Sequence, residues 1–162
     1  MSKSIRQFLA EGKKVEQIFV DSYKKLTKRD LDVVYPTTKQ DMEEHWDVQI
    51  NGVKIDVKGA KRKSRKELEF NSKIHWIELT NVNGDPGWLY GQADYFAFQW
   101  EDTFILVESE VLREHINNMN VNSITSTPTV NSFYSRGGRR DLLLLISSEV
   151  LIKLGDRMIK IQ

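Results

Sequence analysis

The dipeptide Asn51-Gly52 separates two short stretches in which apolar and polar residues alternate. Asn-Gly is the preferred centre of a two-residue type I′ turn, which connects adjacent antiparallel strands. We therefore predict a hairpin over residues 45–58, and this turn allows one pairing register. In that register Ile50 pairs with Val53, Gln49 with Lys54, Val48 with Ile55 and Asp47 with Asp56. Because successive side chains of a strand point to opposite faces, the register also assigns every residue of the hairpin to a face.

The predicted hairpin has one apolar face and one polar face. Trp46, Val48, Ile50, Val53, Ile55 and Val57 share the apolar face, and His45, Asp47, Gln49, Lys54, Asp56 and Lys58 share the polar face. Directly opposed residues have Cβ atoms about 5 Å apart, and like charges at that distance are destabilising. The pair Asp47 and Asp56 therefore requires a cation, which Lys58 supplies in part and a divalent metal would complete. An ordinary solvated hairpin face is the alternative, and the hairpin alone leaves both interpretations open.

A third carboxylate comes from the N-terminal segment. Residues 4–26 carry apolar side chains at helical spacing, which predicts an amphipathic helix. At about 100° per residue, Glu16 falls on the flank of the apolar stripe, away from the arc of Lys13 and Gln17. An unpaired carboxylate on the core side is costly, so Glu16 requires a partner. That partner is either a structural Lys or Arg or a metal-linked site.

The order of these residues resembles that of the PD-(D/E)xK nuclease superfamily, which has the restriction-endonuclease-like fold. In that family a helix glutamate precedes an aspartate at one strand and a (D/E)xK tripeptide on the next. Glu16, Asp47 and the tripeptide Asp56-Val57-Lys58 occur here in that order. The later segments Gly87-Trp88 and Ala93-Asp94-Tyr95 are also similar to segments found in such nucleases. The chain departs from the family pattern in having Trp46 where the family name has proline, and Asp where the tripeptide more often has Glu.

The resemblance implies a Mg²⁺ site, at which Mn²⁺ should substitute. Asp47, Asp56 and the Val57 carbonyl would hold the ion, because Mg²⁺ prefers hard oxygen ligands. Glu16 would bind the same ion through water or help to hold a second one. Lys58 would orient or deprotonate the attacking water and stabilise developing charge, and a plain salt bridge to an aspartate is its structural alternative. Smaller roles as hydrogen-bonding neighbours are expected for His45, which would lie opposite Lys58, and for Gln49 and Gln92.

DNA is the expected partner, although the net charge of +1 is mild for a nucleic-acid-binding protein. Attraction to phosphate must therefore come from local clusters of basic residues. The first cluster follows the tripeptide and the second surrounds Gly137-Gly138: Lys61, Arg62, Lys63, Arg65 and Lys66, then Arg136, Arg139 and Arg140. Such contacts would give salt-sensitive affinity without base recognition, and a solvated surface is the alternative for each cluster.

Composition limits the class of protein. With 162 residues, of which 40% are hydrophobic, the chain is long enough for one substantial core, which predicts a single domain over residues 1–162. The longest apolar run, residues 142–146, is far shorter than the roughly 20 residues of a membrane-spanning helix. The N-terminus lacks the apolar run of a signal peptide, so we expect a cytoplasmic protein without membrane association, in the host cytoplasm if it is phage-encoded. The absence of cysteine excludes disulfides and thiol nucleophiles.

The rest of the chain predicts an α/β or α+β fold with a central mixed sheet flanked by helices. Residues 73–80 are expected to form a strand that extends the hairpin into a sheet, and residues 81–87 a loop. A second hairpin over residues 95–107, a helix over 111–118 and a long surface loop over 120–140 should follow. The last elements expected are a strand over residues 141–146, a short helix capped by Ser147 or Ser148 and ended by Gly155, and an extended segment over 158–161.

Three functions are compatible with these features. The first is a Mg²⁺-dependent endodeoxyribonuclease acting in DNA recombination, repair or degradation, as the resemblance implies. A junction-cutting version would most simply be a two-fold homodimer. The second is a non-catalytic DNA-binding module that retains the nuclease fold. The third is a structural or interaction protein that uses the acidic hairpin face as an interface.

Overall fold

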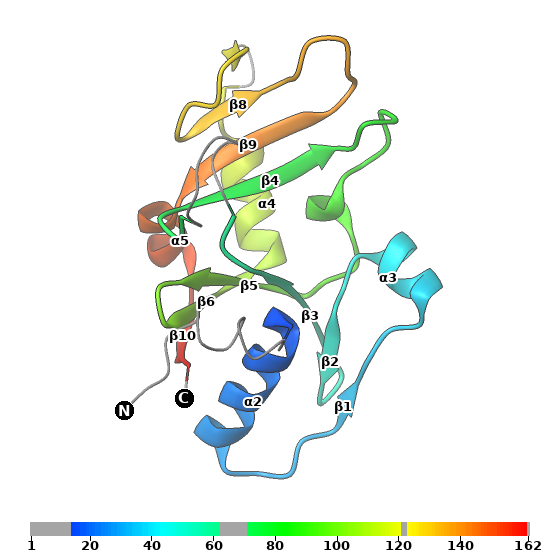
Figure 1. The fold of residues 1–162 in the computed structure, drawn as a ribbon, viewed down its shortest axis with the longest axis vertical. Helices are drawn as coiled ribbons and strands as arrows, with labels where there is room; N and C mark the ends of the chain where they lie inside the picture. Colours follow the sequence, from blue (N-terminus) through cyan, green and yellow to red (C-terminus); the bar gives the residue numbers. More distant parts are fainter. Residues whose placement is uncertain (1–13, 62–70, 121–122, 162) are drawn as a thin grey trace.

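The computed structural model describes residues 14–61, 71–120 and 123–161, and this part of the chain forms two mixed β-sheets with α-helices packed around them (Figure 1). The larger sheet has the order β1-β2-β3-β5-β6-β10, in which β3 and β5 are parallel and all other neighbours are antiparallel. Its strands are β1 (Val33–Val34), β2 (Val48–Ile50), β3 (Val53–Lys58), β5 (Tyr95–Trp100), β6 (Thr103–Glu108) and β10 (Arg157–Lys160). The predicted mixed α/β class is confirmed.

The smaller sheet has the order β4-β9-β8-β7. Its strands are β4 (Ile74–Thr80), β9 (Leu142–Ser147), β8 (Ser132–Tyr134) and β7 (Ile124–Thr125). The expectation that β4 would extend the hairpin is therefore wrong, because β4 pairs with β9 while β3 pairs in parallel with β5. A parallel pair needs a long crossover connection, and here β4 is itself part of that connection. The expected loop over residues 120–140 is also wrong in part, since it contains the short strands β7 and β8.

The Asn51-Gly52 turn forms as predicted. Both residues have positive φ, 48° and 84°, as a type I′ turn requires. Val48 pairs with Ile55, and the two intervening pairs follow the same register. The strand pairing ends there, however, because β2 begins at Val48.

The segment before β2 departs from the predicted hairpin. Helix α3 (Thr38–Glu44) ends at His45, whose φ of 56° turns the backbone out of the strand conformation. His45 therefore does not lie opposite Lys58. Trp46 packs with Ile77 and Leu89 between the two sheets, and not with Val48 on the predicted apolar face. A break in the backbone conformation ends the alternation of side chains on which the prediction for these positions depended.

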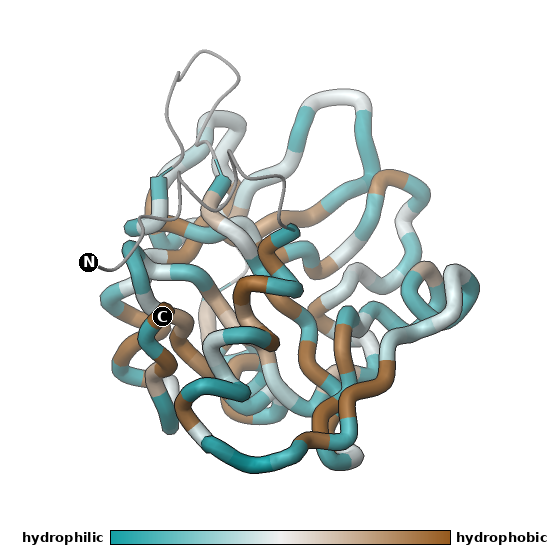
Figure 2. The backbone as a smooth tube through the Cα atoms, turned by 60° about the horizontal axis from the view of Figure 1, so that its bottom comes forward, coloured by the Kyte–Doolittle hydropathy of each residue, from teal (hydrophilic) through white to brown (hydrophobic). Residues whose placement is uncertain are grey.

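Helix α2 (Val15–Thr27) covers one face of the larger sheet. It begins after Lys14, whose backbone is extended, so the single helix predicted over residues 4–26 does not continue through this position. The part of that prediction over residues 4–13 lies outside the described residues. The apolar side of α2 packs against β3, β6 and β10, in a core that includes Ile18, Phe19, Val20, Val48, Ile55, Val57, Phe104 and Ile159. Figure 2 shows the alternation of apolar and polar stretches along this helix.

The opposite face of the larger sheet packs against the smaller sheet. This second core contains residues of β4, β5, β6, β8 and β9, and it is completed by α4 (Ser109–Asn117) and α5 (Ser148–Leu154). In Figure 1 the smaller sheet and α2 accordingly lie on opposite sides of the larger sheet. The β5–β6 hairpin, α4, and α5 with its Ser147 cap and Gly155 end are confirmed. None of the helices described is both long and apolar enough to cross a membrane.

Candidate active site at strand β3

Asp56 is a buried carboxylate in the middle of a strand. The residue is 2% exposed, and its Oδ1 lies 2.8 Å from Lys58 Nζ. Its Oδ2 is buried and has no hydrogen-bond donor in the described part of the protein, apart from the neighbouring Asp47 carboxyl group when that group is protonated. Burial raises the pKa of Asp56, and the positive charge of Lys58 opposes this increase. A buried carboxylate oxygen without a partner is costly, so this position is suited to a cation or a proton.

Asp47 precedes the first residue of β2, and its carboxyl group lies next to that of Asp56. Its N–H donates to the Ile55 carbonyl (2.9 Å), and its Oδ2 accepts a 2.7 Å hydrogen bond from the Val57 N–H. Burial, followed by the negative charge of Asp56, raises the pKa of Asp47 to about 7. The predicted direct strand pairing of Asp47 with Asp56 does not form, but the two carboxyl groups still interact. Near neutral pH the pair therefore retains a proton at Asp47 for part of the time.

Lys58 is held between a carboxylate and an aromatic ring. Its Nζ contacts Asp56 and lies 4.1 Å from the centre of the Trp88 ring. Trp88 begins the short helix η1 (Trp88–Tyr90), which connects β4 to β5. The Trp88 ring also packs edge-on against Phe96, with 5.2 Å between the ring centres. Its contact with Lys58 was not predicted, although the Gly87-Trp88 segment was a signal.

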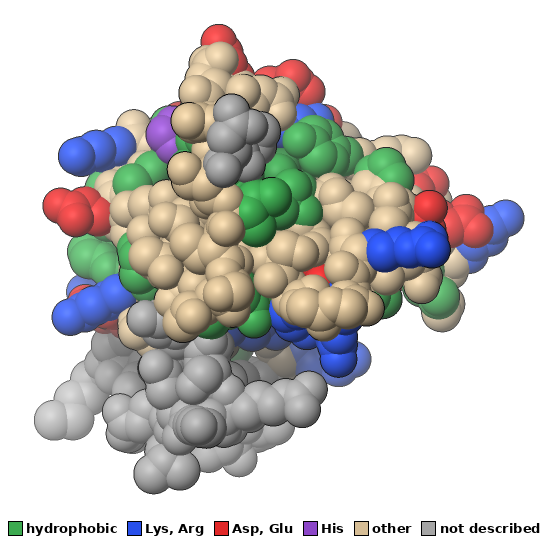
Figure 3. Space-filling view, turned by 90° about the horizontal axis from the view of Figure 1, so that it is seen from above, with side chains coloured by type: hydrophobic (Ala, Val, Ile, Leu, Met, Phe, Trp, Pro, Cys, Tyr) green, Lys and Arg blue, Asp and Glu red, His purple; other side chains and the backbone are tan. Residues whose placement is uncertain are grey.

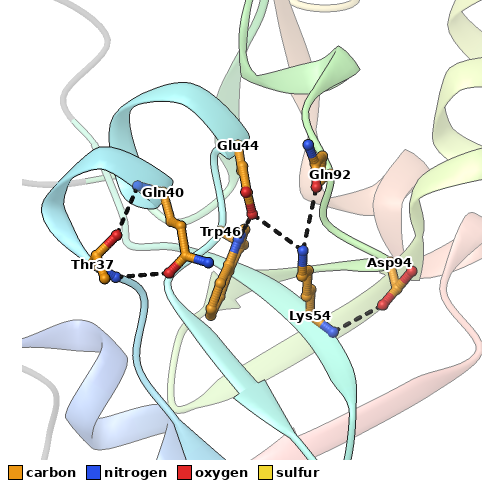
Figure 4. Close-up of polar contacts among 7 residues, drawn as sticks. All are labelled: Thr37, Gln40, Glu44, Trp46, Lys54, Gln92 and Asp94. Carbon is orange, nitrogen blue, oxygen red and sulfur yellow. Dashed lines mark hydrogen bonds and ion pairs between the residues drawn. The ribbon is translucent and has the colours of Figure 1, made fainter.

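A polar network fixes the segment that leads to Asp47 (Figure 4). Glu44 Oε2 accepts hydrogen bonds from Trp46 Nε1 (2.6 Å) and Lys54 Nζ (3.1 Å). Lys54 also donates to Gln92 Oε1 (3.3 Å), and its backbone N–H donates to Asp94 Oδ2 (2.9 Å). Hydrogen bonds from Trp46 and then Lys54 lower the pKa of Glu44. The network therefore ties α3, β3 and the segment before β5 together, and it engages Gln92 structurally.

Glu16 lies on the other side of the sheet from the two aspartates. Helix α2 packs on the face of β3 that carries Ile55 and Val57, whereas Asp56 alternates with them and points to the opposite face. The partly buried Glu16 is in the first turn of α2, next to Val15, whose side chain packs against Gly59 at the end of β3. Across the described residues, no group of three or more His, Cys, Asp or Glu side chains is arranged as metal ligands.

Two further polar residues come from β2 and α3. Gln49 lies opposite Lys54 in the β2–β3 ladder. Asp41 of α3 adds a small negative contribution that helps to raise the pKa of Asp56. Helix α3, and with it Asp41, was not predicted, although Thr37 and Gln40 form a capping box, a recognisable sequence signal, at the start of this helix. The structure thus adds an acidic helix on one side of the site.

The described basic residues proposed to contact DNA lie after β3 and in the β8–β9 loop. Lys61 is exposed after β3, and Arg62, Lys63, Arg65 and Lys66 lie outside the described residues. Arg136 forms an ion pair with the buried Asp141, to which its guanidinium group donates hydrogen bonds through both Nε and Nη2. Arg139 and Arg140 are exposed in the β8–β9 loop. On the described part of the face in Figure 3, lysine and arginine side chains form separate groups, without a continuous basic patch.

The fold and the site define a mixed α/β protein with a buried acidic pair and an adjoining lysine. No protein-family model, curated protein or solved structure matches this chain. The candidate site is therefore characterised by its own side chains: Asp47, Asp56 and Lys58, with Trp88 above the lysine.

Proposed function

We propose that this protein is a Mg²⁺-dependent endodeoxyribonuclease that acts in DNA recombination, repair or degradation. The buried Oδ2 of Asp56, beside Asp47 and Lys58, is the observation that carries this proposal. Two adjacent acidic groups that resist ionisation are typical of sites that bind a divalent cation or hold a proton for catalysis. The resemblance of the tripeptide Asp56-Val57-Lys58 to that of PD-(D/E)xK nucleases favours the first of these.

The residues present fit a small divalent cation. Asp47 and Asp56 would provide carboxylate oxygens, and the Val57 carbonyl would provide a third ligand. In an antiparallel pair, a residue directs its N–H and its C=O towards the same neighbouring strand. Because the Val57 N–H donates to Asp47, its carbonyl also points to the side on which Asp47 lies. Mg²⁺ usually retains several waters, so three protein ligands are sufficient, and Mn²⁺ would substitute.

The chain's own side chains have separate tasks at this site. A bound Mg²⁺ ion would supply charge neutralisation at the phosphate and a lower pKa for its water. Asp47 and Asp56 hold the position and must both be ionised to do so. Lys58 places a positive charge next to the reacting phosphate, where it orients water and stabilises developing negative charge. Glu16, in the first turn of α2 beside the end of β3, lies across the sheet from Asp56 and is therefore not proposed to contact this ion directly.

DNA would be held through its phosphates. Lys61, the basic residues that follow it in the sequence, and the exposed Arg139 and Arg140 would provide sequence-independent contacts. Arg136 contributes to the structure of the β8–β9 loop through Asp141. We further propose that the protein acts in the cytoplasm and that a form cutting branched DNA would be a homodimer.

The test is cleavage of labelled linear duplex, single-stranded, flap and four-way-junction DNA with Mg²⁺, Mn²⁺ or EDTA. Asp56→Asn and Lys58→Ala should each lose metal-dependent cleavage, whereas Asp30→Asn, a matched change at an exposed residue, should retain it. If wild type and Asp56→Asn bind DNA equally and neither cuts it, the protein is a DNA-binding module. If neither DNA nor metal binds, the acidic face serves as an interface with another partner.

A further inference from the structure

We propose that Trp88 is the positioning residue that holds the Lys58 ammonium group against Asp56, an inference that rests on the proposed nuclease function. The ring centre of Trp88 lies 4.1 Å from Lys58 Nζ. An ammonium group over an indole face is attracted by the ring quadrupole, most strongly for tryptophan. Lys58 is therefore restrained by two different partners, a carboxylate and an aromatic ring.

The position of Trp88 is fixed by the smaller sheet. A Cβ atom on Gly87 would lie 2.4 Å from the Glu78 carbonyl oxygen of β4, so no residue with a side chain fits there without displacing backbone. The Gly87 N–H also donates to the Leu79 carbonyl (2.8 Å). Backbone hydrogen bonds from Tyr90 to Gly87 and from Gly91 to Trp88 then close the short helix. These contacts with β4 fix the backbone at Trp88 and therefore restrict the position of its indole ring.

The ring is also held from the larger sheet. Trp88 contacts Phe96 at 5.2 Å and Phe98 at 6.5 Å between ring centres. In the parallel β3–β5 register, Phe96 is the partner of Asp56 and Phe98 is the partner of Lys58. Strand β5 therefore supports the indole directly beside the two residues of the tripeptide. Restraint of Lys58 depends on both sheets, which meet at this point.

The arrangement assigns a role to Lys58. A free lysine side chain has many rotamers and tends to extend its ammonium group into water. The Lys58 side chain is instead 23% exposed and bound at both sides. Lys58 is therefore held in one place beside Asp56, where it would present its ammonium group to a bound phosphate.

The experiment is a double-mutant cycle in the full-length protein. Trp88→Leu should lower the single-turnover rate of Mg²⁺-dependent DNA cleavage about tenfold, with little change in affinity for Mn²⁺ or DNA. Trp88→Phe, which keeps an aromatic face, should recover most of the rate. In the Lys58→Ala background, where cleavage is already lost, the cycle is completed by urea unfolding, in which Trp88→Leu should destabilise the protein less than it does in the wild type. Additive effects in the cycle, or equal damage from Phe and Leu, would overturn the proposal.

A control and a second measurement separate this inference from the function on which it rests. Trp100 packs at the edge of the same core, so Trp100→Leu should lower stability without coupling to Lys58. Urea unfolding of the same variants should show coupling of about two- to fivefold in the unfolding equilibrium constant between Trp88 and Lys58. If wild type cleaves no DNA but this coupling is present, the function fails and the contact stands. If cleavage occurs without any coupling, the positioning role of Trp88 fails.

Discussion

The Asp47 carboxylate accepts a 2.7 Å hydrogen bond from the Val57 N–H, and this bond substitutes for the strand ladder that ends at Val48. A backbone N–H without a partner would be costly in the interior. The side chain of Asp47 satisfies it and is thereby brought next to Asp56. The bend at His45 is what permits this arrangement, because it releases Asp47 from the regular alternation of β2. The acidic pair is therefore formed by an interruption of the hairpin.

Asp47→Asn should stabilise the metal-free protein at alkaline pH while removing metal-dependent activity. Burial and the charge of Asp56 raise the pKa of Asp47 to about 7, so the folded protein retains a proton that the unfolded chain releases near pH 4. The contribution of protonated Asp47 to the free energy of unfolding is therefore fully present below about pH 4, and it is lost as the pH rises through about 7. We expect a gain of about 1–2 kcal/mol for Asp47→Asn in EDTA at pH 8, allowing for partial screening. Urea unfolding measures it, and a variant less stable than wild type at pH 8 would contradict it.

Metal binding should release protons near neutral pH. A cation requires Asp47 in its ionised form, and the pKa of about 7 means that this group is partly protonated at pH 7. The affinity for Mn²⁺ should therefore rise between about pH 6 and pH 8. Calorimetry in two buffers of different ionisation enthalpy measures the proton release directly. Asp30→Asn serves as the matched control, and binding that is independent of buffer and pH would exclude Asp47 as a ligand.

Glu44→Ala should weaken metal binding, although Glu44 is not one of the proposed metal ligands. Glu44 holds Trp46 and Lys54, and these contacts set the path of the chain into Asp47. Loss of a residue that orients a ligand typically costs about tenfold in metal affinity. Glu44→Gln keeps an acceptor for the Trp46 N–H and should recover part of the affinity. Titration with Mn²⁺ tests this, with the exposed Glu114→Gln as control, and unchanged affinity in Glu44→Ala would show that the network does not position Asp47.

His75 should make the protein sensitive to acid. It is 2% exposed, its Nε2 has no partner among the described residues, and burial lowers its pKa to about 4. The unfolded chain takes up this proton near pH 6.5, so stability from this group is complete above that pH and is lost as the pH falls toward 4. The loss should reach about 3 kcal/mol. Comparing urea unfolding of wild type and His75→Phe at pH 7 and pH 4.5 measures it. His115→Gln should keep the wild-type pH dependence, and the same dependence in His75→Phe would disprove the assignment.

The arginines of the β8–β9 loop should differ in their effects. Arg136→Ala should destabilise the protein by about 2–4 kcal/mol, because the 1% exposed Asp141 would lose its partner. Arg139→Ala and Arg140→Ala should leave stability almost unchanged. If these two residues contact phosphate, each substitution should reduce the salt dependence of DNA affinity by about one unit of the log–log slope. Thermal unfolding and salt titrations separate the two effects, and an unchanged slope would remove Arg139 and Arg140 from the DNA interface.

Local sequence patterns determined the elements whose contacts are close in the chain. The Asn51-Gly52 turn, the register of Val48 with Ile55, the β5–β6 hairpin and the cap of α5 at Ser147 all follow from turn chemistry and periodicity. These features depend on residues a few positions apart, and their energies are set by backbone geometry and local hydrogen bonds. The neighbouring positions of Asp56 and Lys58 on one face follow from the same period of two.

Tertiary structure alone decided how the site is assembled. The parallel pairing of β3 with β5, the packing of Trp46 between the sheets and the contact of Trp88 with Lys58 join residues far apart in the chain. The alternation of residues in a strand specifies which of its faces is apolar. It does not specify which other strand will pair with its edge. That choice depends on burying the faces of both sheets and α2 together, and on satisfying backbone groups such as the Val57 N–H. The sequence therefore determined which side chains are available for the acidic site, namely Asp47, Asp56 and Lys58. Long-range packing determined which residues they contact.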